Sequence, residues 1–480
     1  MDIRGRVIRG GAVKLISQLA VTVLRIGYVA VMARLLSPAD FGLLAMVTVV
    51  TGFLDVFATG GLSSATIQRT DISDEQVSGL FWINVAIGCA LSVICLLSGP
   101  LIVHLYGEPQ VAWIAAALAP IFLINALGVQ HGAILMRHLR YEMQSAIDLA
   151  SQLVSIVVGV AMAWAGFSYW SLIAAALVVP ATSAALVWRA VDWRPQRPGV
   201  PAGLGSLLQF GGTVTLNGVV VYLSYNLERA LLGRYWGIDA LGYYTRGQAV
   251  VGMATNSVSS AIGSVAFTAL SRLQREPERL KGYFIRAFSL LMGAVVPPTL
   301  LCALCATEVV HLLLGPKWSA AIPVVQLLAP SMLVFAVLNS LGPFIVAIGM
   351  QNRSLYLGFA LAVVMITAYV IGLPYGITGV ALSFSVAMCL WMVPHVAWCL
   401  HGTNLTVREF FMAAARPMLA GGAGAAATMG VQLATEGFTP LLRLVAASVV
   451  FLSVYGFVLL IALGQLAVYR SLVTAIKDAN

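Results

Sequence analysis

Apolar stretches of about 20 residues or more follow one another along nearly the whole chain, separated by short segments that hold most of the charges. A bilayer core is about 30 Å thick, and a helix needs about 20 apolar residues to cross it. The pattern therefore predicts about 14 membrane-spanning helices. Charged residues make up only 9% of the 480 residues, whereas a soluble domain has about 25%. We expect an all-α polytopic membrane protein.

An internal repeat divides the chain into two similar halves. Arg34-Leu-Leu-Ser-Pro-Ala-Asp-Phe-Gly42 and Arg234-Tyr-Trp-Gly-Ile-Asp-Ala-Leu-Gly242 share an arginine and a glycine in register. Further along, Asn125-Ala-Leu-Gly128 recurs as Asn339-Ser-Leu-Gly342. Duplicated membrane units that surround a midplane site are typical of transporters. The repeat therefore predicts two six-helix bundles, followed by two additional helices.

A proline-rich segment marks the predicted boundary between the halves, because Pro195, Pro198 and Pro201 oppose helix formation. We predict an N-terminal six-helix bundle at residues 1–189 and a cytoplasmic linker at 190–205. A C-terminal six-helix bundle follows at 206–402, and two additional transmembrane helices with a cytoplasmic tail occupy 403–480.

Lysine and arginine residues concentrate in alternate segments between the predicted spans. The opposite side receives only Arg34, Arg234, Arg246, Lys317 and Arg443. The positive-inside rule then places both termini in the cytoplasm. The basic residues form no continuous stripe, so a nucleic-acid partner is not expected. No set of histidine, cysteine and acidic residues has metal-ligand spacing, so no metal site is expected either.

Polar residues within the apolar stretches identify the candidate transport site, because a central charge costs roughly 2.5–3.5 kcal/mol on insertion. In the first predicted helix, residues 10–34, the side chains of Lys14, Gln18, Thr22 and Arg25 share one face. Lys14 has the alternative of reaching back to the lipid headgroups. Arg25 lies too deep for that, so we predict that it faces a hydrated cavity.

Three further helices carry polar faces, and the repeat relates them to the first. Asp55 in the second helix (41–68) is either an ion-pair partner of Arg25 or a protonatable coupling site. Asn217, Glu228 and Arg229 belong to the seventh helix (206–233), where a local interfacial role is the alternative for the charged pair. Asn256 in the eighth helix (242–268) has helix packing as its alternative.

These four helices are predicted to line one central cavity. The predicted substrate-binding residues are Arg25, Lys14, Gln18, Arg229, Asn217 and Asn256, and the candidate ion-coupling residues are Asp55 and Glu228. Asp148 and Gln152 share a face of the fifth helix and receive no role.

Several catalytic signatures are missing from the sequence. There is no Gly-x-x-x-x-Gly-Lys-Ser/Thr phosphate loop, so ATP is not expected to drive the protein directly. There is also no nucleophile elbow and no large extramembrane domain with paired carboxylates. We therefore expect a secondary-type transporter that needs no cofactor, and not an enzyme.

The motifs resemble those of the polysaccharide-repeat-unit flippases, the Wzx-type lipopolysaccharide and exopolysaccharide exporters of the multidrug/oligosaccharidyl-lipid/polysaccharide exporter superfamily. The resemblance rests on Ala33–Gly42, Gly61–Arg69, Leu241–Arg246 and Leu270–Gln274. It implies alternating access of a central cavity, in which cations hold the diphosphate of an undecaprenyl-diphosphate-linked oligosaccharide.

The resemblance also implies location and partners. The location is the bacterial cytoplasmic (inner) membrane, and the partners are the lipid-linked oligosaccharide, membrane lipids and a polysaccharide polymerase or export machinery. Proton or sodium coupling follows from the superfamily alone. By position, Lys14 and Arg25 are similar to first-helix cations of the lipid II flippases.

Alternative functions remain open at this point. A cation-coupled multidrug efflux pump of the same superfamily would need cavity acids, which Asp55 could supply. A lipid II flippase would need more intramembrane arginines than this chain has. A glycan-polymerising membrane enzyme would need long loops with catalytic residues, and a structural scaffold would leave the polar faces unexplained.

Overall fold

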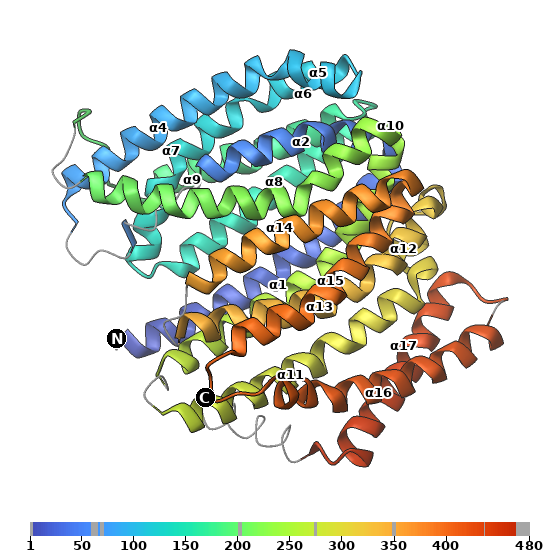
Figure 1. Cartoon of the computed structure of the whole chain (residues 1–480). Helices are drawn as coiled ribbons and strands as arrows, with labels where there is room; N and C mark the ends of the chain where they lie inside the picture. Colours follow the sequence, from blue (N-terminus) through green and yellow to red (C-terminus); the bar gives the residue numbers. More distant parts are fainter. Residues whose placement is uncertain are drawn as a thin grey trace. The chain divides into compact units, whose positions relative to one another are not determined.

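The computed structural model describes residues 3–58, 66–67, 72–199, 204–272, 276–347, 352–435 and 437–466. Within these ranges, some side chains are not described, mainly those of residues 3–16, 19, 204–214, 216–217 and 254–272. All regular secondary structure in the described ranges is helical, which confirms the all-α prediction (Figure 1). The chain forms two compact units, Met1–Thr245 and Arg246–Asn480.

The first unit contains the helices of the N-terminal half. They are α1 (Ile3–Leu35), α2 (Pro38–Ala58), α4 (Asp74–Leu97), α5 (Gly99–Tyr106), α6 (Gln110–Leu118), α7 (Pro120–Arg137), α8 (Tyr141–Trp164), α9 (Trp170–Ala190) and the first part of α10 (Leu204–Arg272). Pro100 and Pro120 each lie in the first turn of a helix, where the missing N–H is tolerated, so they separate α5 from α4 and α7 from α6. Residues 191–199 of the predicted linker are not helical.

The second unit contains the remainder of α10 and the helices after it. They are α11 (Pro277–Leu304), α12 (Ala306–Leu313), α13 (Ile322–Ala347), α14 (Asn352–Gly372), α15 (Gly376–Leu400), α16 (Val407–Ala434) and α17 (Pro440–Phe457). The contact boundary at Thr245 lies beyond the predicted linker, because the first part of α10 packs against α2. The division into bundles at 190–205 stays a prediction.

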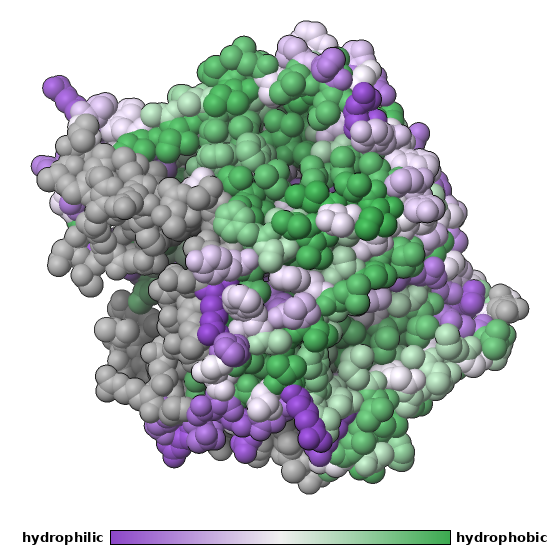
Figure 2. Space-filling view, viewed as in Figure 1, coloured by the Kyte–Doolittle hydropathy of each residue, from purple (hydrophilic) through white to green (hydrophobic). Residues whose placement is uncertain are grey.

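Nine segments of the described residues are long and apolar enough to cross a membrane. One of them, Tyr356–Leu400, covers most of α14 and all of α15. With α1, the two parts of α10 and α16, the described chain has 14 long helical segments, in agreement with the predicted count. Apolar side chains also cover much of the face in Figure 2, and Leu97, Trp164 and Leu390 are more than two-thirds exposed. Such a surface fits lipid and not water.

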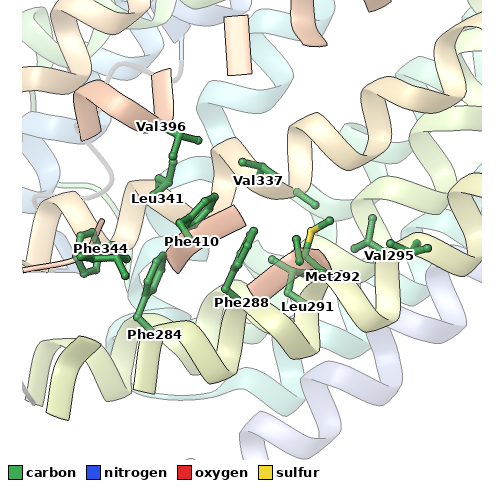
Figure 3. Packing of buried hydrophobic residues seen from close by; sticks show 14 of the residues in the cluster. Phe284, Phe288, Leu291, Met292, Val295, Val337, Leu341, Phe344, Val396 and Phe410 are labelled. Atoms are coloured by element: carbon green, nitrogen blue, oxygen red, sulfur yellow. The ribbon is translucent and has the colours of Figure 1, made fainter. Parts of the chain in front are cut away.

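Aromatic stacking organises the core of the second unit (Figure 3). Phe284 and Phe288 are one turn apart on α11, so they lie on the same face. The ring of Phe288 lies 4.0 Å from that of Phe410 on α16, and the ring of Phe284 lies 4.5 Å from that of Phe344 on α13. One face of α11 therefore joins the last helix pair to the rest of the unit.

The repeated motif forms a reciprocal contact within the first unit. A Cβ atom on Gly42 would lie 2.7 Å from the carbonyl carbon of Ile238, and one on Gly242 would lie 2.8 Å from that of Pro38. Both pairs differ by the same 200-residue offset, so each copy of the motif packs its glycine on the backbone of the other copy. This is the pattern of a twofold-related contact, and both glycines are needed because no larger residue fits.

An ion pair beside the membrane-spanning part of α16 also ties α16 to α11. Lys281 Nζ lies 2.7 Å from Glu409 Oε1, and the N–H and hydroxyl of Thr406 donate to Oε2 at 3.0 and 2.9 Å. The hydrogen bond from Lys281 and those from Thr406 lower the pKa of Glu409 from its ordinary 4.5 to about 2. The folded pKa is depressed, so the stabilisation is present above about pH 4.5 and is lost as the pH falls through about 2.

We expect Glu409→Gln to lower the unfolding temperature of the purified protein slightly at pH 7, because exposed ion pairs contribute little. The difference from wild type should shrink below pH 4.5 and vanish near pH 2. Thermal unfolding in detergent across this range measures it, with Glu75→Gln, at an exposed acid in the first turn of α4, as the control for loss of a surface carboxylate. A difference that does not change with pH would contradict the assignment.

Candidate functional site

A cavity of about 580 Å³ lies within the first unit. Its lining comes from α1, α7, α8 and α9, together with Ile67. Among the described lining residues, Arg25 is the one basic side chain and Asp148 is the one acidic side chain. The remaining polar lining residues are Ser17, Gln18, Tyr141, Gln144, Ser145, Ser151, Gln152 and Ser183. This is an unusually polar wall for a protein in which 60% of the residues are hydrophobic.

The helices α1 and α8 pack side by side and in parallel. The hydroxyl of Ser17 donates to the carbonyl oxygen of Ser145 at 3.3 Å. Eleven residues later on α1, the Tyr28 hydroxyl lies 2.8 Å from where a Cβ on Gly159 would be. Gly159 therefore allows the two helices to approach, and the contacts fix which residues of α8 face the polar stripe of α1.

The side chain of Asp148 is held by its own helix. Gln144 lies one turn before it, and Gln144 Nε2 donates to Asp148 Oδ1 at 2.9 Å. The oxygen of the same amide, Gln144 Oε1, is buried with no hydrogen-bond partner among the described residues, as is Ser151 Oγ. Buried polar atoms in proteins are nearly always paired, so these two oxygens call for a hydrogen-bond donor from outside the described residues.

The cavity therefore combines two kinds of binding group. The guanidinium of Arg25 offers a planar set of donors that suits a phosphate or a carboxylate. The hydroxyl, amide and carboxylate groups around it suit a ligand with many hydroxyls. An anionic ligand that also carries sugars matches both sets, whereas a purely apolar molecule matches neither.

Two of the predicted site residues, Arg25 and Gln18, line this cavity, and both side chains are exposed. Thr22, on the same predicted face, donates to the Gln18 carbonyl oxygen at 2.8 Å. The predicted positions Lys14, Asn217 and Asn256 lie on α1 and α10, but their side chains are outside the described residues.

Arg229, Glu228 and Asp55 belong to a different polar cluster, where α10 packs on α2. The Tyr222 hydroxyl donates to the carbonyl oxygen of Val49 at 2.8 Å, and Tyr222 lies within electrostatic range of all three charged residues. Arg229 Nε is 4.0 Å from Glu228 Oε1, and the Glu228 side chain is only 1% exposed. These three residues do not line the described cavity.

The described cavity brings only part of the predicted set together, namely Arg25 and Gln18. The cavity around Arg25 is lined by α1 and by α7 to α9, so it contains one of the four repeat-related helices, and the central cavity predicted between those four stays a prediction. Packing explains this lining: α1 contacts α8 along its length, so its polar face meets α8. The roles predicted for Asp55 and Glu228 stay predictions.

Asp148, Gln144 and Ser151 are the candidate site residues that the sequence did not assign. One signal was visible, since Asp148 and Gln152 share a helix face. An i, i+4 polar pair is equally typical of helix packing in membranes. Only the contact between α1 and α8 shows that this face of α8 lines the cavity and does not merely pack against another helix.

Comparisons with known proteins agree on a family. The sequence matches the family described as "Polysaccharide biosynthesis protein" over residues 31–323, which is more than half of the chain. It is 27% identical over 392 residues to the lipopolysaccharide biosynthesis protein WzxC of Escherichia coli, covering 80% of this chain and 79% of that protein. It is 25% identical over 439 residues to the teichuronic acid biosynthesis protein TuaB of Bacillus subtilis, covering 88% of each.

Solved structures with the same fold are membrane transporters. The lipid II flippase MurJ in an inward closed conformation matches with a TM-score of 0.76 at 13% identity, covering 95% of this chain and 99% of that chain. An inward-facing multidrug resistance transporter of the MATE family matches with a TM-score of 0.62 at 16% identity, covering 80% and 97%. At these identities the likeness shows the fold, which is that of a multi-pass membrane protein.

Proposed function

Because the chain belongs to the polysaccharide biosynthesis protein family, we propose that it moves a lipid-linked oligosaccharide across the bacterial cytoplasmic membrane. The substrate is an undecaprenyl-diphosphate-linked repeat unit, and it passes from the cytoplasmic to the periplasmic leaflet by alternating access. The product serves lipopolysaccharide or exopolysaccharide synthesis, with a polymerase or export machinery as the next partner. Both termini lie in the cytoplasm.

One observation carries this proposal, namely the polar cavity that contains Arg25 within the membrane-spanning first unit. A diphosphate with attached sugars cannot cross the hydrocarbon core unaided, because its polar groups would lose their hydration. A hydrated cavity with one guanidinium offers the headgroup a polar path while the prenyl chain stays in lipid. A proton or sodium gradient supplies the energy in this proposal, as the superfamily resemblance implies.

Deletion of the gene in its own host tests the function. We expect loss of the surface polysaccharide together with accumulation of the lipid-linked oligosaccharide on the cytoplasmic leaflet. Extraction and mass spectrometry identify the lipid, and a periplasmic glycan-modifying enzyme reports the leaflet. Normal display of every surface polysaccharide in the deletion strain would refute the proposal.

A multidrug efflux pump is the second candidate, favoured by the MATE fold and by the acid in the cavity. Expression in a host that lacks its own efflux pumps separates the two. We expect no change in the minimum inhibitory concentrations of cationic drugs and dyes. A clear increase that depends on Asp148 would favour the pump instead.

A further inference from the structure

One wall of the cavity is rich in hydrogen-bond acceptors. Asp148 presents an exposed carboxylate, and the unpartnered Gln144 Oε1 and Ser151 Oγ lie beside it on the same helix. All three come from one face of α8, at spacings of four and three residues. Unpaired buried oxygens carry a free-energy penalty, which hydroxyl donors from a ligand would relieve.

The two charges of the cavity lie at different depths. The contact between Ser17 and Ser145 sets a common level on the two helices. Arg25 is eight residues beyond this level on α1, and Asp148 is three residues beyond it on α8. The contact between Tyr28 and Gly159 sets a second level. Arg25 is three residues before this level on α1, and Asp148 is eleven residues before it on α8. At 1.5 Å per residue, Arg25 therefore lies roughly 8–12 Å further along the parallel helices than Asp148. One extended ligand can reach both groups with different parts of itself.

Charge decides which part of the ligand meets which group. A diphosphate beside the Asp148 carboxylate would be repelled, because both groups are negative. Arg25 attracts the diphosphate instead. The part of the ligand next to the acceptor-rich wall must then be uncharged and rich in hydroxyl groups.

We propose that Gln144, Asp148 and Ser151 bind the sugar joined to the diphosphate, and that Asp148 determines which sugar is accepted. A carboxylate accepts hydrogen bonds from two neighbouring hydroxyls, so it senses their positions on the ring. The inference rests on the proposed function and assigns two binding positions within the cavity. The phosphates bind at Arg25, and the first sugar binds at α8.

Binding of two lipids to the purified full chain tests the inference. The first is undecaprenyl diphosphate alone, and the second is the lipid-linked oligosaccharide extracted from the deletion strain. We expect wild type to bind the sugar-bearing lipid more tightly. Asp148→Ala should bind undecaprenyl diphosphate as wild type does but lose roughly tenfold in affinity for the sugar-bearing lipid, the scale of a lost hydrogen bond to a charged group. Arg25→Gln should weaken both.

The controls separate the failures. Glu142→Gln changes an acid on the same helix that does not line the cavity, and it should behave as wild type. If wild type binds neither lipid, the proposed function fails. If wild type prefers the sugar-bearing lipid and Asp148→Ala keeps that preference, only the inference fails. If Asp148→Ala changes the affinity for both lipids equally, Asp148 acts on the diphosphate, for example through a bound cation. That result would also overturn the inference.

Discussion

Replacement of Arg25 by glutamine is expected to abolish polysaccharide export while the protein still inserts into the membrane. Arg25 is the one basic side chain among the described lining residues, so its loss leaves no described cation to hold the diphosphate. A charge-assisted contact is worth roughly 1.5–3 kcal/mol, or about ten- to hundredfold in affinity. Arg25→Lys keeps the charge but not the bidentate geometry, so partial export is expected.

Complementation of the deletion strain measures this effect, with surface polysaccharide quantified against the amount of protein in the membrane. Arg416→Gln is the matched control, because Arg416 is an exposed arginine on α16 that does not line the cavity. Full export by the Arg25→Gln variant at normal protein levels would remove Arg25 from the site.

The second large effect is expected at the reciprocal glycine contact. In Gly42→Ala the new methyl group would collide with the backbone of Ile238, and in Gly242→Ala with that of Pro38. Backbone cannot move aside as a flexible side chain does, and overpacking costs about 1–3 kcal/mol or more. Each variant should therefore lower the unfolding temperature and reduce the amount of protein in the membrane.

The two substitutions should also interact. Because both glycines belong to the same reciprocal contact, the double variant should lose less stability than the sum of the losses in the two single variants. Gly252→Ala is the control, since Gly252 lies on α10 with open space where its Cβ would be. Wild-type stability in both single variants would show that the contact relaxes without loss.

Much of the fold could be predicted from local features of the sequence. The length of the apolar stretches fixed the helices, since a span must satisfy its backbone internally. The match between Gly42 and Gly242 predicted a duplication, and the structure places these glycines in one reciprocal contact. Among the site residues, Arg25 and Gln18 could be found because a polar stripe on a membrane helix needs water, a partner or a ligand.

The other wall of the cavity could not be predicted, because helix packing decides it. A membrane helix such as α8 has several polar positions, and the sequence does not say which neighbour each one faces. The assignment of Asp148 depends on Gly159, which lets Tyr28 of α1 approach α8. A close approach of this kind is set by tertiary contacts and not by the period of the helix.

The reciprocal contact of Gly42 and Gly242 also suggests a comparison between this chain and a dimer of two identical halves. In a single-copy ancestor that paired as a twofold dimer, one glycine would have made both contacts, and two identical cavities would have formed. In this chain the contact has its glycines at positions 42 and 242, whereas the polar residues of the two halves differ. The positions 200 residues after Lys14, Gln18 and Arg25 are Val214, Gly218 and Tyr225. The two copies of the motif thus share the glycine contact but not the polar face of α1, because none of these three later residues is charged.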